Sequence, residues 1–174
     1  MIYTAGHRAR LVKDNLFNFV ESGLTDLGWF DAGRQHSPLR MLADAEPWDE
    51  EIRPNLVAIS TEGVTDNDLE LGSMLAEHHW AYFIDLIAET ESLGLHLATD
   101  VRDMLQGRIT TLTLVGPYVP VYDLSVQSAT PNLITTVEIS DVSMDKGRIY
   151  TKQQKKSWWQ VGFTVIDDYG TDDD

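Results

Sequence analysis

The segment Trp158-Trp159-Gln160-Val161-Gly162-Phe163-Thr164-Val165 decides the fold class, because it carries the sharpest alternation in the chain. On an extended backbone, successive side chains point to opposite faces. Four large apolar side chains then share one face: Trp159, Val161, Phe163 and Val165. The segment therefore predicts a strand that covers a hydrophobic core with one face.

Two other stretches have helical periodicity. Between Thr4 and Ser22 the apolar side chains form one stripe, and Gly23 stands where a helix-ending glycine belongs. A second stripe begins after Thr90 or Ser92 and stops at Gly107. The stripes consist of Val12, Leu16, Phe19 and Val20 in the first helix, and of Leu93, Leu97, Val101, Met104 and Leu105 in the second.

The remaining strands are shorter or more ambiguous. Pro54 suits the first position of a strand and precedes Leu56–Ile59, while residues 71–87 look extended with both faces apolar. We predict a hairpin between 56–60 and 77–87, with Thr61–Asp68 as a turn-rich acidic loop. Further strands are predicted at 27–30, 112–115, 119–124 and 133–142.

This order of elements predicts an α+β fold: a mainly antiparallel sheet with two helices packed on one face, long loops and a hairpin extension. At 174 residues, one domain is the default. We expect it to span residues 1–167, with an elaboration at 109–132 and an acidic, disordered tail at 168–174.

Composition excludes several classes of protein. A net charge of −15 argues against a protein that holds duplex DNA, which needs Lys and Arg to neutralise phosphates. The absence of cysteine excludes disulfides, thiolate zinc sites and cysteine nucleophiles. No apolar run is long enough for a transmembrane helix, and the start lacks the pattern of a signal peptide. We expect a soluble, cytoplasmic protein.

The charge is unevenly distributed. Residues 44–91 hold thirteen acidic side chains and one arginine, a net charge of −12. Residues 146–156, which we call the basic arm, hold five basic side chains and no acid, and residues 167–174 then hold five aspartates. Blocks of like charge repel one another, so they must face solvent or a complementary partner.

The sequence shows no convergent catalytic or metal-binding group. The common phosphate-binding, hydrolase and zinc-protease motifs are absent. His78 and His79 are neighbours on a predicted strand and so point to opposite faces, which prevents joint chelation. Asp100 and Asp103 share an exposed helix face, where carboxylates serve mainly as solvated surface. We therefore expect no enzyme activity, no cofactor and no metal.

Trp158 is the most unusual single residue, because it follows Lys155-Lys156 and lies on the face opposite Trp159. Aromatic side chains beside basic ones can stack on nucleic-acid bases. Aromatic residues are also enriched in the cores of protein interfaces. We favour an interface or second-layer packing for Trp158.

The residue order resembles the tail-terminator proteins of long-tailed bacteriophages over about residues 5–108 and 133–167. An amphipathic helix leads into an aromatic strand with a tight turn. A proline-initiated strand, an acidic hairpin, an aromatic strand and an acidic link to the second helix follow. The stretches that carry the resemblance are Leu27–Gly33, Arg53–Ile59, Trp80–Ile87, Ala88–Ser92, Asp103–Arg108 and Trp158–Val165.

The resemblance implies a structural virion protein at the junction of tail and neck. It would form a homohexameric ring that caps the tail tube, stops its polymerisation and binds the head-completion protein, while DNA passes through the lumen without specific binding. On this reading, acidic loops face the lumen or an axial partner, and the basic arm with Trp158 binds a neighbour. The acidic residues are Asp44, Glu46, Asp49, Glu50, Glu51, Glu62, Asp66, Asp68 and Glu70. The interface residues are Lys146, Arg148, Lys152, Lys155, Lys156 and Trp158.

Two alternatives stay open. Another head–tail connector or neck protein of the same virion would share the ring architecture. An acidic DNA mimic, whose carboxylates imitate phosphates to inhibit a DNA-binding protein, would also explain the excess of acid, although the basic arm interrupts such mimicry.

Overall fold

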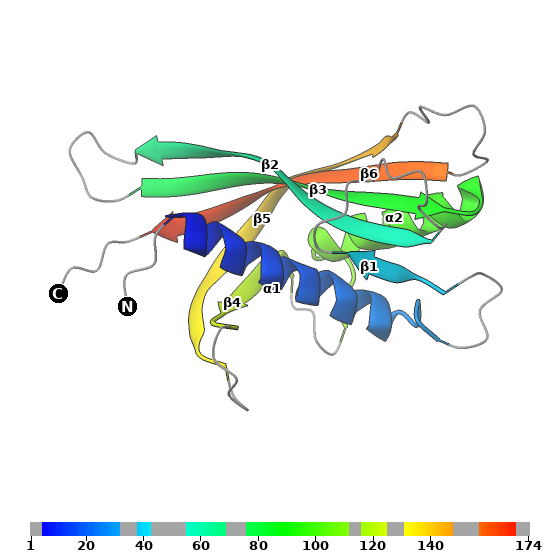
Figure 1. The fold of residues 1–174 in the computed structure, drawn as a ribbon, viewed down its shortest axis with the longest axis horizontal. Helices are drawn as coiled ribbons and strands as arrows, with labels where there is room; N and C mark the ends of the chain where they lie inside the picture. The colour runs from blue at the N-terminus through cyan, green and yellow to red at the C-terminus, as the bar shows by residue number, and fades with distance from the viewer. Residues whose placement is uncertain are drawn as a thin grey trace.

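Two helices and six strands make up the part of the chain that the computed structural model describes, namely residues 5–31, 38–42, 55–68, 76–111, 116–124, 131–147 and 157–169. Figure 1 shows their arrangement. In chain order they are α1 (Ala5–Asp26), β1 (Arg40–Leu42), β2 (Leu56–Asp68), β3 (Ala76–Ala88), α2 (Glu91–Leu105), β4 (Tyr118–Tyr122), β5 (Leu133–Lys146) and β6 (Ser157–Tyr169).

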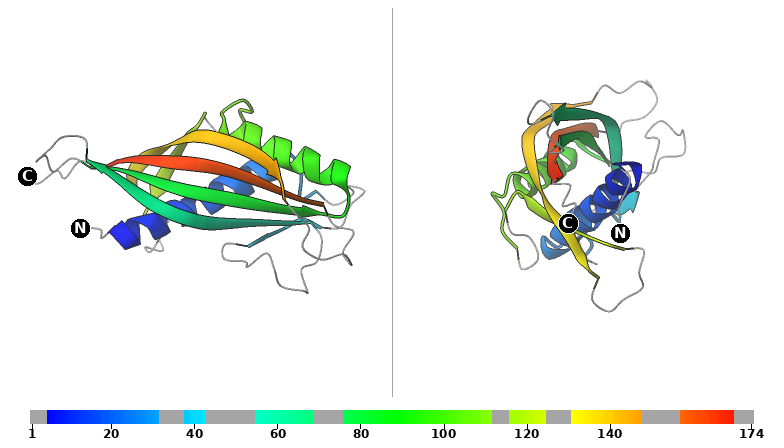
Figure 2. Two further views of the ribbon diagram at one scale, coloured as in Figure 1. Left: turned by 90° about the horizontal axis from the view of Figure 1, so that it is seen from above. Right: turned by 90° about the vertical axis from the view of Figure 1, so that its left-hand side faces the viewer.

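The six strands form one sheet in the order β1-β2-β3-β6-β5-β4. All neighbouring strands are antiparallel except β1 and β2, which are parallel. The sheet curls around α1, as the end-on view of Figure 2 shows. The predicted α+β class, with a mainly antiparallel sheet, is therefore confirmed.

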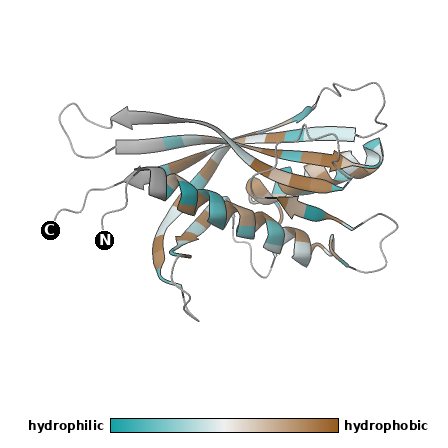
Figure 3. Cartoon of the chain, in the orientation of Figure 1, coloured by the Kyte–Doolittle hydropathy of each residue, from teal (hydrophilic) through white to brown (hydrophobic). Residues whose placement is uncertain are grey.

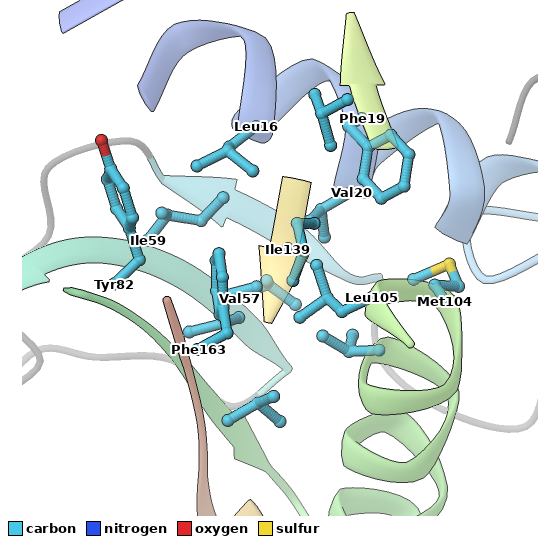
Figure 4. Packing of buried hydrophobic residues seen from close by; sticks show 14 of the residues in the cluster. Leu16, Phe19, Val20, Val57, Ile59, Tyr82, Met104, Leu105, Ile139 and Phe163 are labelled. Atoms are coloured by element: carbon cyan, nitrogen blue, oxygen red, sulfur yellow. The ribbon is translucent and has the colours of Figure 1, made fainter. Parts of the chain in front are cut away.

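Both helices contribute to a single core on the inner face of the curled sheet. Figure 4 shows α1 side chains such as Leu16 and α2 side chains such as Leu105 meeting Ile59, Ile139 and Phe163 from the strands. Figure 3 shows the same division by hydropathy, with teal along one side of α1. The apolar stripes predicted for both helices are buried, apart from Leu93, which is partly buried against the core.

Each helix ends in a Schellman motif. After α1, the Trp29 amide donates to Leu24 O at 2.9 Å and the Gly28 amide donates to Thr25 O at 2.8 Å, with Gly28 at φ 73°. The prediction that α1 ends at Gly23 is thus wrong, and so is the strand predicted over 27–30. Aromatic residues there gave a strand-like pattern, but Trp29 is buried against the core by the helix-ending turn.

The start and end of α2 were predicted correctly. The Thr90 hydroxyl accepts from the Leu93 amide as the N-cap. Gly107 adopts φ 65°, and the Arg108 amide donates to Asp103 O at 2.8 Å. Glycine suits this left-handed position because it has no Cβ.

The β2–β3 hairpin is confirmed but is longer than predicted. Leu56 pairs with Ile87 and Asp68 pairs with Ala76, so Thr61–Asp68 is strand and not loop. The acidic composition of this segment gave no strand pattern in the sequence. The segment is a strand because it pairs with β3, and a bulge between Thr61 and Gly63 interrupts the pairing. Residues 71–75 and Thr4 lie outside the described residues.

The other strands differ from prediction mainly in length. The predicted strands at 119–124 and 133–142 correspond to β4 and β5, whereas 112–115 lies outside the described residues. The segment 109–132, expected as an elaboration, contains β4, whose Val119 and Val121 belong to the core. Asp168 and Tyr169, predicted to belong to the acidic tail, are in β6, and residues 170–174 lie outside the described residues.

Candidate functional site

Acidic residues from three strands meet at one end of the sheet. The pairing places Asp66 of β2 beside His78 of β3, and His78 beside Asp167 of β6. One residue further on, Glu77 pairs with Asp168. We call this region the acidic sheet end and define it by Asp66, Asp68, Glu77, Asp167 and Asp168. The pairing thereby brings the acidic middle of the chain and its acidic C-terminal segment, about 90 residues apart, to the same end of the sheet, at positions that alternate between its two faces.

The pairing of Glu77 with Asp168 is unfavourable for the sheet itself. Like charges at directly opposed strand positions destabilise the pairing. Violations of a local folding rule occur preferentially where function requires them. The opposed acids therefore single out this end of the sheet as a candidate functional surface.

An ion pair fixes α1 to this end of the sheet. Arg8 binds Asp167 with two hydrogen bonds, in which Nε donates to Oδ2 and Nη2 donates to Oδ1 at 2.8 Å. The Asp167 side chain is fully buried and that of Arg8 is 12% exposed. Such two-point guanidinium–carboxylate pairs fix orientation as well as charge. The ion pair neutralises one carboxylate and holds the first turns of α1 beside the end of β6, where Figure 1 also places them.

Tyr82 lies next to this ion pair on the inner face. Its hydroxyl donates to Ala9 O at 3.3 Å, and its ring stacks on Phe163 with centroids 5.8 Å apart. Burial, followed by the negative charges of Asp14 and Asp167, raises the pKa of the Tyr82 phenol, which is therefore neutral at physiological pH. The inner side of the acidic sheet end is thus a packed layer.

The structure describes part of the predicted acidic set. Glu62, Asp66 and Asp68 lie in β2, with Glu62 at the bulge, whereas they were predicted in a loop. Their strand location is what brings Asp66 and Asp68 to the acidic sheet end. The predicted residues Asp44, Glu46, Asp49, Glu50, Glu51 and Glu70 lie outside the described residues.

Lys146 is the member of the basic arm that the structure describes. It ends β5, where its ammonium group donates to Glu91 of α2 and lies 6.0 Å from the centroid of the Trp159 ring. Lys146 thus contacts its own chain at the α2–β5 seam. Arg148, Lys152, Lys155 and Lys156 lie outside the described residues.

Trp158 is half-buried on the outer face of the sheet, opposite the core. Its indole N–H donates to Asp85 Oδ1 at 2.9 Å, and the Gln160 amide donates to the same oxygen at 3.0 Å. Gly147 lies directly against the indole, since a Cβ there would come within 2.1 Å of the ring. Trp158 is therefore held in a second layer by its own chain.

Asp85 is a buried carboxylate that sequence inspection did not single out. It is 3% exposed, and burial raises its pKa although the hydrogen bonds from Trp158 and Gln160 act in the opposite direction. The sequence shows Asp85 as an acidic residue inside an otherwise apolar strand. The partners of Asp85 could not be predicted, because they come from β6, more than 70 residues away.

Asp100 and Asp103 were expected to be exposed, yet both are mostly covered. Asp100 accepts from the Trp29 indole N–H at 2.9 Å and lies 3.5 Å from His96 Nε2. Asp103 binds Arg102 at 2.8 Å. The Asp100 contact joins the turn after α1 to α2, whereas Asp103 binds a neighbour within α2.

Among the residues that the structure describes, no three His, Asp or Glu side chains are grouped so as to hold a metal ion. His78 and His79 occupy consecutive positions of β3. Within the same part of the chain, no helix has the length and apolar character needed to cross a bilayer.

Comparisons of the sequence with protein families and with curated proteins found no match. No protein-family model matches the chain, and no curated protein matches it significantly.

Proposed function

We propose that this chain is a tail-terminator protein of a long-tailed bacteriophage: a homohexameric ring that caps the tail tube and joins it to the head-completion protein. The order of helices and hairpins fits the residue pattern on which this resemblance rests, except at residues 27–30, where a helix-ending turn stands in place of the aromatic strand. The proposed location is the tail–neck junction of the virion.

The observation that carries the proposal is the acidic sheet end. In a ring through which DNA passes, a wall of Lys and Arg would retain the polyanion, whereas carboxylates repel it and let it slide. That role needs acidic residues held near one another by a rigid element. The pairing of β2, β3 and β6 brings acidic positions to one end of the sheet, and the ion pair of Arg8 with the buried Asp167 anchors this end to α1.

The partners on this proposal are the other subunits, the last ring of the tail tube and the head-completion protein. The basic arm would bind an acidic surface on one of them. Lys146 is engaged within its own chain, so the proposal assigns the other basic residues of the arm to that partner, namely Arg148, Lys152, Lys155 and Lys156.

Deletion of the gene tests the function directly. A terminator deletion produces overlong tails that are detached from heads, whereas loss of a neck protein further from the tube leaves tails of normal length without heads. Tails of normal length joined to heads would reject the proposal. Electron microscopy of the lysate measures both properties at once.

A charge-reversal pair tests the basic arm. Changing Lys155 and Lys156 to Glu should reduce attachment of heads to tails, because the arm then repels an acidic partner. The matched control is Arg10→Glu, which alters an 81% exposed basic residue on α1. Equal attachment of heads to tails by the wild type and the lysine variant would show that the basic arm is not part of the interface.

The DNA-mimic alternative is favoured by the same acidic positions, since Asp66 and Asp68 lie two residues apart on β2, where positions on one face repeat at roughly 7 Å. Inhibition of a non-specific nuclease by the purified protein would support that alternative.

A further inference from the structure

A long stretch of β2 has an open hydrogen-bonding edge. β1 pairs with residues 56–58 of β2, and beyond Ala58 no described strand lies on that side of β2, which continues to Asp68. Figure 1 shows β1 beside the start of β2, while the arrowhead of β2 lies at the other end of the sheet. We call residues 61–68 the free β2 edge.

The backbone groups of every second residue on this edge point away from the sheet. The Arg40 amide donates to Asn55 O at 2.9 Å, so the odd-numbered residues of β2 before the bulge direct their backbone groups towards β1. The bulge after Thr61 shifts this alternation by one residue. The N–H and C=O groups that point outward are therefore those of Val64, Asp66 and Asp68. An edge of this kind is a template for an added strand.

The helix α1 approaches the free β2 edge without filling the space beside it. Between them lies a hollow of about 330 Å³. It is lined by Ala9, Arg10, Lys13 and Asp14 of α1 and by Thr61 of β2. The charges there are mixed, since Arg10 Nε lies 3.8 Å from Asp14 Oδ2. The hollow leaves room for a further chain segment next to the edge.

The free β2 edge and the basic arm have opposite charge. Residues 61–68 hold three acidic side chains and no basic one, whereas residues 146–156 hold five basic side chains and no acid. The arm also contains Ile149-Tyr150-Thr151, residue types that favour strands, and it has no proline that would remove a backbone donor. Opposite charges on neighbouring strands stabilise the pairing. The basic arm therefore has the chemistry of a strand that would bind this edge.

A subunit cannot place the arm on its own free β2 edge. Ser157, which follows the arm, pairs with Ala88 at one end of β3. Val64 pairs with Trp80, eight residues and about 26 Å further along β3. Residues 148–156 are joined to the sheet at both ends, so they extend at most about 17 Å from it. The occupant must be the arm of a second copy.

We propose that the basic arm of one copy of this chain adds as a strand to the free β2 edge of the next copy. This inference rests on the proposed ring and names the contact between its subunits. The arm and the edge are different surfaces of each subunit, so repetition of the contact closes a ring or continues as a filament. Glu77 and Asp168 belong to β3 and β6, so their positions stay outside the contact and available to the lumen.

Sedimentation velocity with a proline variant tests the backbone contact. Val64→Pro removes an outward N–H that the sheet of its own chain does not use, and proline is tolerated at such edge positions. It should lower the association constant about tenfold or more, because a carbonyl group of the added strand loses its donor. The control Val64→Ala keeps the N–H and should associate like the wild type. Equal association of the two variants would overturn the proposal, as would a wild-type chain that sediments only as a monomer.

A charge swap tests the pairing of arm and edge without a change to the backbone of β2. The arm variant changes Lys152, Lys155 and Lys156 to Glu, and the edge variant changes Glu62 and Asp68 to Lys. Each variant alone should abolish rings in negative-stain electron micrographs, and all five changes in one chain should restore them. An equimolar mixture of the two variants should also form rings, because alternating subunits of an even-numbered ring match at every contact.

The control for the edge variant changes Glu138 and Asp145, two exposed acidic residues of β5, to Lys and should leave rings intact. Equal loss of rings in this control, rings in either variant alone, or failure of both restorations would overturn the pairing. If the wild type forms rings and caps tails while these variants behave like it, only the contact is wrong. Wild-type tails of uncontrolled length would instead reject the terminator function itself.

Discussion

Arg8 and Asp167, 159 residues apart in the chain, form a two-point ion pair that ties the start of α1 to the end of β6. Asp167 is fully buried, so its charge depends on Arg8 for compensation. We expect Arg8→Met to lower the free energy of unfolding by about 3–5 kcal/mol, because it leaves a buried carboxylate without its cation. Urea denaturation of wild type and variant measures the difference.

The double variant Arg8→Met with Asp167→Leu is the control for this prediction. Replacement of both charges by apolar groups should recover most of the lost stability, since the penalty comes from an uncompensated charge. A double variant as unstable as Arg8→Met alone would show that packing of Arg8, rather than the ion pair, is what matters.

Asp85 should make stability depend on pH in an unusual direction. Its pKa is raised in the folded state, so the folded protein binds more protons than the unfolded chain between the ordinary aspartate pKa and the raised value. The contribution of Asp85 to stability is therefore present below the ordinary pKa and is lost as the pH rises through the folded-state pKa. Asp85→Asn should remove this loss. Calorimetric melting temperatures across pH 3 to 8 would measure it, with exposed Asp145→Asn as the control.

Substitution of Gly94 by alanine has two opposing effects on the free energy of unfolding. Alanine in a helix is favoured over glycine by roughly 1 kcal/mol, but a Cβ at Gly94 would come within 2.8 Å of the Trp159 ring. Overpacking of this kind costs about 1–3 kcal/mol. We expect Gly94→Ala to be destabilising, and Trp159→Leu to reduce that cost without abolishing it, because Ser157 Oγ would still lie 2.9 Å from the new Cβ. A double-mutant cycle by thermal unfolding would reject the clash if the two effects were additive.

The Asn15 side-chain amide occupies part of the outer edge of β4, because it forms hydrogen bonds with both backbone groups of Tyr122. Asn15→Ala should cost about 1–3 kcal/mol through the polar groups left unpaired. Amide hydrogen exchange of Tyr122 should accelerate. Asn15→Asp keeps the acceptor but loses the donor, so the Tyr122 amide should stay protected; equal exchange in both variants would contradict this role.

The sequence predicted elements whose pattern is local. The alternation in β6 and the stripe and caps of α2 are set by neighbouring residues, and both elements were found where expected. The end of β2 and all of β1 were missed, because their polar or very short segments become strands only through pairing with β3 and β2. The strand predicted over 27–30 failed for the opposite reason, since its aromatic pattern comes from a helix-ending turn.

The candidate site was predictable in composition but not in position. The acidic blocks are plain in the sequence, yet only the pairing of β3 with β6 brings Glu77 to Asp168. The partners of Asp167 and Asp85 are likewise more than 70 residues away, and no local pattern signals contacts of such range.

The place of β6 in the middle of the sheet has a consequence for biosynthesis. This strand, the last of the six to leave the ribosome, separates β1-β2-β3 from β5-β4. Until it emerges, the strand that joins β3 to β5 is missing, and so is Asp167, which binds Arg8 in the folded protein. Native structure therefore forms after translation of this segment rather than progressively, and a truncated product lacks the strand that would let it compete with intact chains for a place in an assembly.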